Sequence, residues 1–154
     1  MFVCHGNICR SPMAEFIFKS LASERGAAER FTVESSATST EEIYRGVGNP
    51  VYPPARAELL RHGIDPRGKR ARRLEPSDLP KYDMFIGMDQ SNVRGMHSIL
   101  GEGAKDKIYM LTDFFAKGTS IADPWYFGNF DKTYSDIHKG CTALLDRLMS
   151  DISD

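Results

Sequence analysis

The chain has 154 residues, of which 41% are hydrophobic and 27% charged, as is typical of one folded domain spanning residues 1–154. A net charge of −1 gives no global attraction to nucleic acid or to an anionic membrane, and no apolar run is long enough to span a bilayer. Three cysteines make no closed disulfide framework and no zinc-ligand spacing is present, so we expect a cytoplasmic protein without a metal or other cofactor.

Strands and helices alternate along the chain. The pattern predicts strands at residues 2–3, 31–35, 84–88 and 108–111, and helices at residues 12–25, 53–62, 90–100 and 133–152. This order predicts an α/β fold, a doubly wound four-stranded parallel sheet with helices on both faces. The first strand is short, because only three residues precede Cys4. Cys141 lies in the apolar stripe of the last helix and is predicted to be a core residue, and the basic run at residues 67–73 to be a solvated loop.

The stretch VCHGNICRSP leaves the first strand and enters the first helix, at the sheet edge where ligands bind in such folds. Gly6 and Asn7 tolerate positive φ, so the backbone can turn successive N–H groups inward. Ser11 is expected to cap the helix, and Pro12 suits the first helical position. Arg10 adds a planar guanidinium that can bind two oxygens of a tetrahedral anion, so the loop predicts a phosphate site.

Cys4 lies at the base of this loop. The helix N-terminus and Arg10 favour its thiolate form. A thiolate that touches a phosphoryl group suggests in-line displacement through a cysteinyl-phosphate intermediate. Ser11, by donating a hydrogen bond to the sulfur, could make Cys4 a better leaving group in the second step.

Displacement of an alkoxide or phenoxide needs a proton donor, and Asp123 is the best candidate. It follows the fourth strand, at the same edge of the sheet. Pro124 biases Asp123 away from helix, and the aromatic residues 125–127 give the carboxyl group an apolar surround that suits a proton donor. The histidines within the predicted helices are expected to serve packing or to lie at the surface.

The motif CHGNICRS, followed by PMAE and much later by DPW, resembles the low-molecular-weight protein tyrosine phosphatases over nearly the whole chain. The resemblance implies that Cys4 is the nucleophile, that Arg10 binds the phosphate and that Asp123 is the general acid. It implies a phosphotyrosine-containing protein as substrate and inorganic phosphate as product, and we expect a monomer. The expected phosphate-binding loop comprises His5, Gly6, Asn7, Ile8, Cys9 and Ser11, with Asn7 and Ser11 shaping the loop and assisting the thiolate.

Two further roles follow from the resemblance. The stretch SSATS matches a family segment whose first serine or threonine buttresses the phosphate loop, and we assign this buttress to Ser36. The cysteine that matches Cys9 can form a reversible disulfide with the nucleophile, since a neighbouring thiol can trap a sulfenic acid. The alternative for Cys9 is simple packing inside the loop.

The walls of the pocket are expected to be aromatic. Many eukaryotic relatives carry a tryptophan after the Thr-Ser stretch, where the nearest aromatic residue here is Tyr44. We expect Tyr44, Trp125 and Tyr126 to stack against an aryl ring, with His5 at the rim.

Three other functions remain as alternatives. Thioredoxin-coupled arsenate reductases share the loop, but they need relay cysteines that are missing between Cys9 and Cys141. Protein-arginine phosphatases typically carry threonine at the position of Ile8, whose apolar side chain suits an aromatic ring better. A phosphate-carrier module would have no need of an acid such as Asp123.

Overall fold

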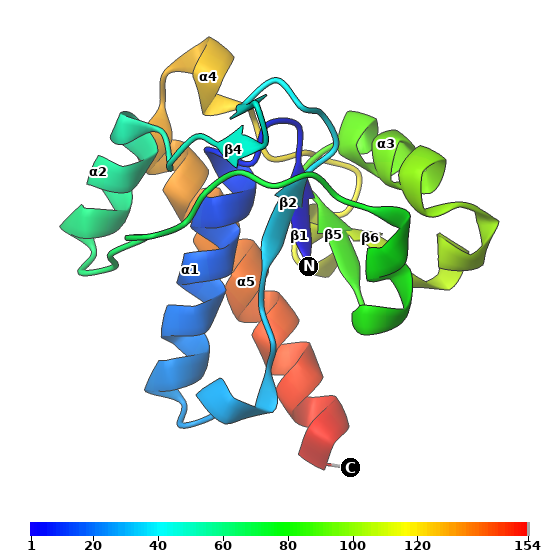
Figure 1. The fold of residues 1–154 in the computed structure, drawn as a ribbon. Helices are drawn as coiled ribbons and strands as arrows, with labels where there is room; N and C mark the ends of the chain where they lie inside the picture. The colour runs from blue at the N-terminus through cyan, green and yellow to red at the C-terminus, as the bar shows by residue number, and fades with distance from the viewer. Residues whose placement is uncertain (154) are drawn as a thin grey trace.

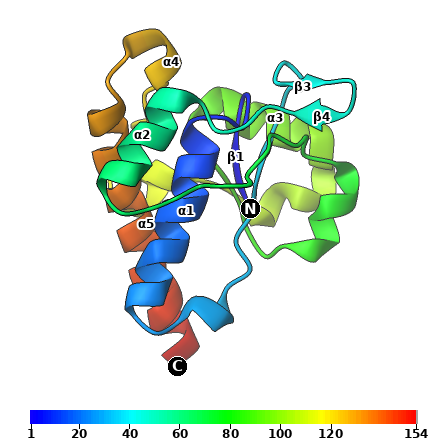
Figure 2. The same ribbon diagram turned by 60° about the vertical axis from the view of Figure 1, so that its left-hand side comes forward.

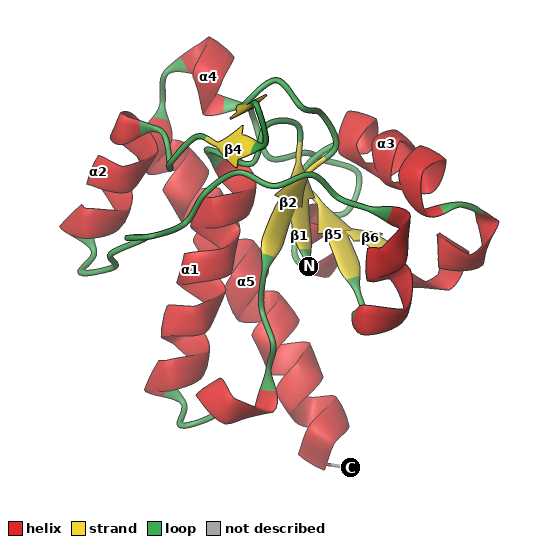
Figure 3. Cartoon of the chain, in the orientation of Figure 1, coloured by secondary structure: helices red, strands yellow, loops and turns green. Residues whose placement is uncertain are grey.

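The sheet has four strands in the order β2-β1-β5-β6 in a computed structural model that describes residues 1–153 (Figures 1 and 3). All three neighbouring pairs are parallel. The prediction of an α/β fold with a four-stranded parallel sheet is therefore confirmed. The strands are β1 (Phe2–Cys4), β2 (Ser35–Ala37), β5 (Phe85–Gly87) and β6 (Ile108–Met110).

Helices cover both faces of this sheet, as predicted (Figures 1 and 2). Phe2 and Ile86 point to the face where α1, α2 and α5 supply the larger core. Their strand neighbours Val3 and Phe85 point to the opposite face, where they pack with residues of α3. The helices are α1 (Arg10–Glu24), α2 (Pro53–Arg61), α3 (Gln90–Leu100) and α5 (Phe130–Ser153).

The first helix begins at Arg10, two residues earlier than expected, with Cys9 as its N-cap. Ser11 is therefore not the cap, which corrects our expectation. It lies inside the first helical turn, where its hydroxyl oxygen is 3.0 Å from Cys4 Sγ. The Ser11 side chain therefore contacts the Cys4 sulfur and does not cap the helix.

The second strand lies further along the chain than the prediction of residues 31–35. Its ladder begins at Ser35 because the partner strand β1 begins at Phe2, and these two residues pair. Phe2 N still donates to Glu34 O at 2.9 Å, but the residues before Glu34 have no β1 residue to pair with. The short β1 suffices since it is paired on both sides, with β2 and with β5.

Several short elements were not predicted. Strands β3 (Ile43–Tyr44) and β4 (Val47–Gly48) form an antiparallel hairpin whose two connecting residues, Arg45 and Gly46, both have positive φ, at 51° and 79°. The turn α4 (Pro124–Phe127) rises above the sheet edge in Figure 1. The 3-10 turns are η1 (Ala28–Arg30), η2 (Pro76–Lys81), η3 (Glu102–Lys107) and η4 (Leu111–Phe114).

The last helix behaves as its sequence pattern predicts. Cys141 is fully buried on the α5 face that packs against the sheet, among Ile137, Leu144 and Leu145. This confirms Cys141 as a core residue. No helix within residues 1–153 has the length and apolar character needed to cross a membrane.

Candidate active site

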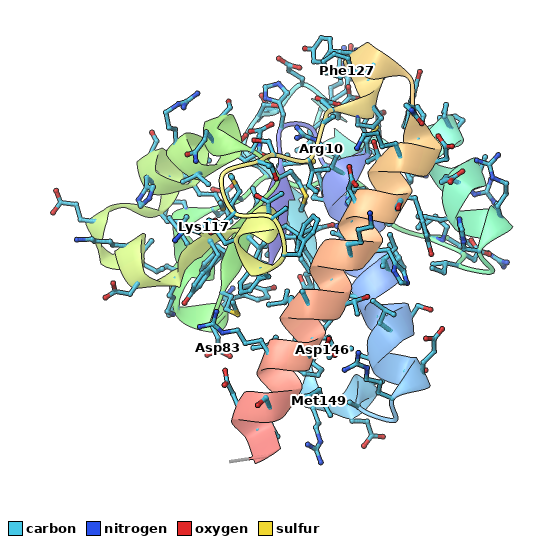
Figure 4. The ribbon with its side chains drawn as sticks, turned by 180° about the vertical axis from the view of Figure 1, so that it is seen from behind. Arg10, Asp83, Lys117, Phe127, Asp146 and Met149 are labelled. Carbon is cyan, nitrogen blue, oxygen red and sulfur yellow. The ribbon has the colours of Figure 1, made fainter. Side chains whose placement is uncertain are left out.

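The loop between β1 and α1 lies at the carboxyl end of the parallel strands. Figure 4 shows Arg10 at this edge, below the turn α4 that carries Phe127. Asn7 adopts a left-handed conformation with φ of 62°, which lets the chain reverse its direction within the loop. This is the curled backbone that the Gly-Asn pair predicts.

Cys4 is buried at the base of the loop, and two backbone N–H donors and one hydroxyl group surround its sulfur. The backbone N–H groups of Asn7 and Ser11 donate to Sγ at 3.3 and 3.4 Å. The Ser11 hydroxyl oxygen lies 3.0 Å from the same sulfur. Such donors stabilise a negative charge on the sulfur more than on a neutral thiol.

Arg10 is held in place by a buried network. Its Nη1 donates to Asp89 Oδ2 at 2.8 Å and to the Ile121 carbonyl at 2.9 Å, while the side chain is only 3% exposed. Burial lowers the pKa of Arg10, but Cys4 and Asp89 raise it by more, so the guanidinium stays charged. The sequence analysis missed Asp89, although this acidic residue directly follows the strand predicted at residues 84–88. It caps α3 by accepting from Asn92 N.

Asp123 reaches the same pocket from the loop before α5. Its Oδ1 accepts from Trp125 N at 3.0 Å, so the carboxylate caps α4, and its Oδ2 lies 3.5 Å from Arg10 Nη2. The side chain is one quarter exposed. The structure therefore brings Cys4, Arg10 and Asp123 together from two segments more than a hundred residues apart.

Only some of the residues predicted to form the pocket walls line the pocket. Trp125, Tyr126 and His5 line the pocket, but Tyr44 does not. The hairpin turns Tyr44 outward, where 71% of it is exposed. Two acidic residues that were not predicted, Glu41 and Glu42, line the pocket in its place.

The rim residues also contact one another. His5 Nε2 lies 3.0 Å from Glu41 Oε2, and Glu42 Oε2 accepts from Asn49 at 2.8 Å. Trp125 packs against Tyr52, with ring centroids 4.7 Å apart. Tyr52 is thus a support of the wall that the sequence analysis missed.

The buttress of the loop is Ser35 and not the expected Ser36. Ser35 Oγ accepts from Asn7 Nδ2 at 2.9 Å, whereas no donor or acceptor lies within hydrogen-bond distance of Ser36 Oγ. Ser36 contributes only its carbonyl oxygen, 3.4 Å from Ser11 Oγ. The reason is the register: Ser35 pairs with Phe2 and shares its side of the sheet, the side of α1, while Ser36 pairs with Val3.

The basic run at residues 67–73 is not simply a solvated loop. Arg72 N donates to Asn7 Oδ1 at 3.0 Å, and Lys69 Nζ donates to the Ser35 carbonyl at 2.8 Å. The Lys69 side chain is only 12% exposed. This run therefore contacts both the loop between β1 and α1, at Asn7, and the strand β2 that supports it, at Ser35.

Cys9 and Ile8 complete the loop. Both are buried, line the pocket and pack with Ala71. Burial, followed by the charges of Cys4 and Asp123, raises the pKa of Cys9, so this sulfur is a protonated thiol at neutral pH. Within residues 1–153, no three His, Cys, Asp or Glu side chains gather in a way that could hold a metal ion.

Comparison with known proteins places these features in a family. Residues 1–154 match the family described as low molecular weight phosphotyrosine protein phosphatase. The chain is 36% identical over 147 residues to the low molecular weight protein-tyrosine-phosphatase YfkJ of Bacillus subtilis, covering 94% of this chain and 92% of that protein. A human low molecular weight phosphotyrosine protein phosphatase is 35% identical over 152 residues, covering 96% and 93%. The crystal structure of YfkJ superposes with a TM-score of 0.90 at 34% identity, covering 97% of this chain and 93% of that one.

Proposed function

Since the chain belongs to the low molecular weight phosphotyrosine protein phosphatase family, a family of hydrolases, we propose that it hydrolyses phosphotyrosine in proteins by way of a cysteinyl-phosphate. The observation that carries this proposal is the meeting of Cys4, Arg10 and Asp123 in one pocket. Residues 1–154 act as one domain, a statement supported by the match of a single family profile to the whole chain.

In the first step the Cys4 sulfur attacks phosphorus. A sulfur–phosphorus bond forms as the bond from phosphorus to the phenolic oxygen breaks. Arg10 and the inward N–H groups of the loop hold the phosphoryl oxygens and stabilise the charge that builds on them. Asp123 gives its proton to the departing phenolic oxygen, so tyrosine leaves as a neutral phenol.

In the second step water releases the phosphate. Asp123, now a carboxylate, takes a proton from the water as its oxygen attacks phosphorus, and the sulfur leaves as a thiolate. The donors around Cys4, among them the Ser11 hydroxyl at 3.0 Å, stabilise that leaving thiolate. The enzyme returns to its starting state with inorganic phosphate as product.

An aromatic substrate fits the walls of this pocket better than phosphoarginine. Trp125 and Tyr126 can stack on an aryl ring, and the apolar Ile8 offers no hydrogen bond to a guanidinium. The deciding experiment compares hydrolysis of a phosphotyrosine peptide and a phosphoarginine substrate, both with a chelator present. We expect turnover of the tyrosine substrate with little on arginine, while a preference for phosphoarginine would overturn the assignment of substrate.

The nucleophile has its own test. Cys4→Ser is expected to abolish turnover while inorganic phosphate still binds, because Arg10 and the loop remain. Turnover equal to that of the wild type would rule out Cys4 as nucleophile. Asp123 separates the enzyme from the phosphate-carrier alternative, which needs no acid: unchanged hydrolysis of an aryl phosphate by Asp123→Asn would rule out the general acid and favour the carrier.

We assign Cys9 a protective redox role in a cytoplasmic monomer. Peroxide converts the Cys4 thiolate to a sulfenic acid, and the Cys9 thiol displaces water from it to form a disulfide. Both sulfurs lie at the same pocket and are free thiols in the structure. After brief treatment with hydrogen peroxide, peptide mapping should find the Cys4–Cys9 disulfide, and a reductant should restore activity. In Cys9→Ser, activity should become irrecoverable; full recovery would leave Cys9 with a packing role.

A further inference from the structure

A buried line of hydrogen bonds runs from the active-site sulfur into the protein interior. Ser11 Oγ lies 3.0 Å from Cys4 Sγ and accepts from Asn7 Nδ2 at 2.8 Å. The same Asn7 amide group donates to Ser35 Oγ at 2.9 Å, and Ser35 Oγ donates to Glu15 Oε1 at 2.7 Å. All five side chains are buried, so this line ends at a carboxylate and not in solvent.

The directions of the hydrogen bonds between Glu15 and Ser11 are fixed. The Glu15 carboxylate is an acceptor only, so the Ser35 hydroxyl must donate to it and present a lone pair to Asn7. Asn7 Oδ1 accepts from Arg72 N at 3.0 Å, which agrees with the amide orientation in which Nδ2 donates to both serines. Ser11 Oγ therefore accepts from Asn7 and keeps its single proton for another acceptor.

Two acceptors compete for that proton. The Cys4 sulfur lies at 3.0 Å from Ser11 Oγ and the Ser36 carbonyl at 3.4 Å. A thiolate accepts hydrogen bonds but does not donate them, and it is both the nearer and the charged partner. The Ser11 proton thus points to Cys4 when the sulfur is ionised.

Two lysine side chains hold the Glu15 carboxylate in position. Oε2 accepts from Lys19 Nζ at 2.6 Å, and Oε1 lies 3.5 Å from Lys69 Nζ. Ser11, Glu15 and Lys19 stand four residues apart along α1 and so share one helix face. The two carboxylate oxygens serve three donors, a task that an uncharged amide with one oxygen does not fulfil.

We propose that Glu15 is a positioning residue for the reaction: through Ser35 and Asn7 it orients the Ser11 hydroxyl so that its proton is donated to the Cys4 thiolate. Glu15 touches neither the substrate nor the sulfur, and it acts only through this line. The inference rests on the proposed function solely for the role of Cys4 as nucleophile.

The experiment measures the reactivity of Cys4 and needs no substrate. The rate of alkylation of Cys4 by iodoacetamide is followed against pH, with mass spectrometry to identify the modified cysteine. Glu15→Gln is expected to raise the midpoint of this profile by about one pH unit, since the Ser11 proton is no longer committed to the thiolate. Ser35→Ala should raise it similarly, and Glu24→Gln, an exposed charge on the same helix, should leave it unchanged.

The sign of the shift separates this proposal from plain electrostatics. Removing a negative charge near a thiolate lowers its pKa if the charges act only through space. A midpoint that falls or stays constant in Glu15→Gln would therefore overturn the proposal. If Glu15→Gln does not fold, Ser35→Ala tests the line of hydrogen bonds without a change of charge, and a midpoint that falls or stays constant in that variant would also overturn the proposal.

A double substitution tests the path itself. In a Ser11→Ala background, Glu15→Gln should produce no further shift, because the hydroxyl it orients has gone. An equal shift with and without Ser11 would show that Glu15 acts by another route and would overturn the proposal. Failure of the wild type to hydrolyse phosphotyrosine would reject the proposed function. The alkylation results would still decide whether Glu15 affects the reactivity of Cys4, because they need no substrate.

Discussion

Ser35 and Ser36 form a matched pair of neighbouring, fully buried serines that the structure treats very differently. Ser35 Oγ accepts from Asn7 at 2.9 Å and donates to Glu15 at 2.7 Å. Ser36 Oγ has no partner within hydrogen-bond distance. The substitutions Ser35→Ala and Ser36→Ala remove the same atom from adjacent positions of β2, so one is the control for the other.

The expected difference in stability follows from these contacts. Loss of the Ser35 hydroxyl removes one bond to a neutral group, worth about 1 kcal/mol, and one to a carboxylate, worth about 1.5–3 kcal/mol. Ser35→Ala should therefore lower the free energy of unfolding by about 2.5–4 kcal/mol. Ser36→Ala removes a buried hydroxyl without a partner, and its effect should be about zero or slightly stabilising.

Urea unfolding of the wild type and the two variants measures these differences, with circular dichroism as the probe. At about 2–4 °C per kcal/mol for a chain of this size, Ser35→Ala should also melt roughly 5–15 °C earlier than Ser36→Ala. Equal destabilisation by the two substitutions, or a larger loss for Ser36→Ala, would refute the assignment of the buttress to Ser35.

Three further predictions concern the acid, the arginine and the core. Asp123→Asn should slow phenyl phosphate hydrolysis by about 100-fold or more but p-nitrophenyl phosphate far less, because nitrophenolate leaves without a proton; equal losses would argue against a general acid. Asp89→Asn keeps an N-cap for α3 but weakens the hydrogen bond to Arg10. We therefore expect kcat/KM to fall about tenfold with little change in melting temperature, and a lower melting temperature at full activity would contradict this. Burial raises the pKa of Cys141 above its ordinary 9.0, so the unfolded chain ionises this thiol first and stability falls as pH rises through that value. Urea unfolding at pH 8 and pH 10 should show that Cys141→Ala lacks this loss of about 1.4 kcal/mol between the two pH values, and equal losses in the two proteins would contradict burial of the thiol.

The parallel sheet and the curled backbone of the loop after β1 could be predicted because their signals are local. Alternating strand and helix patterns specify the connection order, and the sequence from Cys4 to Ser11 carries its turn residues and its charges together. Helix α3 was predicted with the bounds Gln90–Leu100 that the structure has. Cys141 was identified from the apolar spacing of its helix alone.

The misassigned buttress depends on the pairing of strands. Adjacent residues of a strand face opposite sides of the sheet, so a choice between Ser35 and Ser36 needs the register with β1. That register is set by contacts between residues more than thirty positions apart. Nothing in the stretch SSATS itself distinguishes the two serines.

Asp89, Tyr52 and Glu41 were missed for a related reason. Each reaches the site from an element far from the loop in sequence, and an acidic or aromatic residue at such a position is common in any soluble protein. Tyr44 was chosen as the nearest aromatic residue after the Thr-Ser stretch. The hairpin turn that directs it outward rests on Arg45 with positive φ, which is uncommon for a residue other than glycine.

The packing of Trp125 on Tyr52 gives the protein a built-in optical reporter. Trp125 is the one tryptophan of the sequence, it is 53% exposed, and it lines the pocket that holds Cys4. Its intrinsic fluorescence therefore comes from the pocket wall alone, with no second indole to obscure the signal. An aryl ring that stacks against it should change both the intensity and the wavelength of emission, so stopped-flow fluorescence can time the arrival of a ligand without a label.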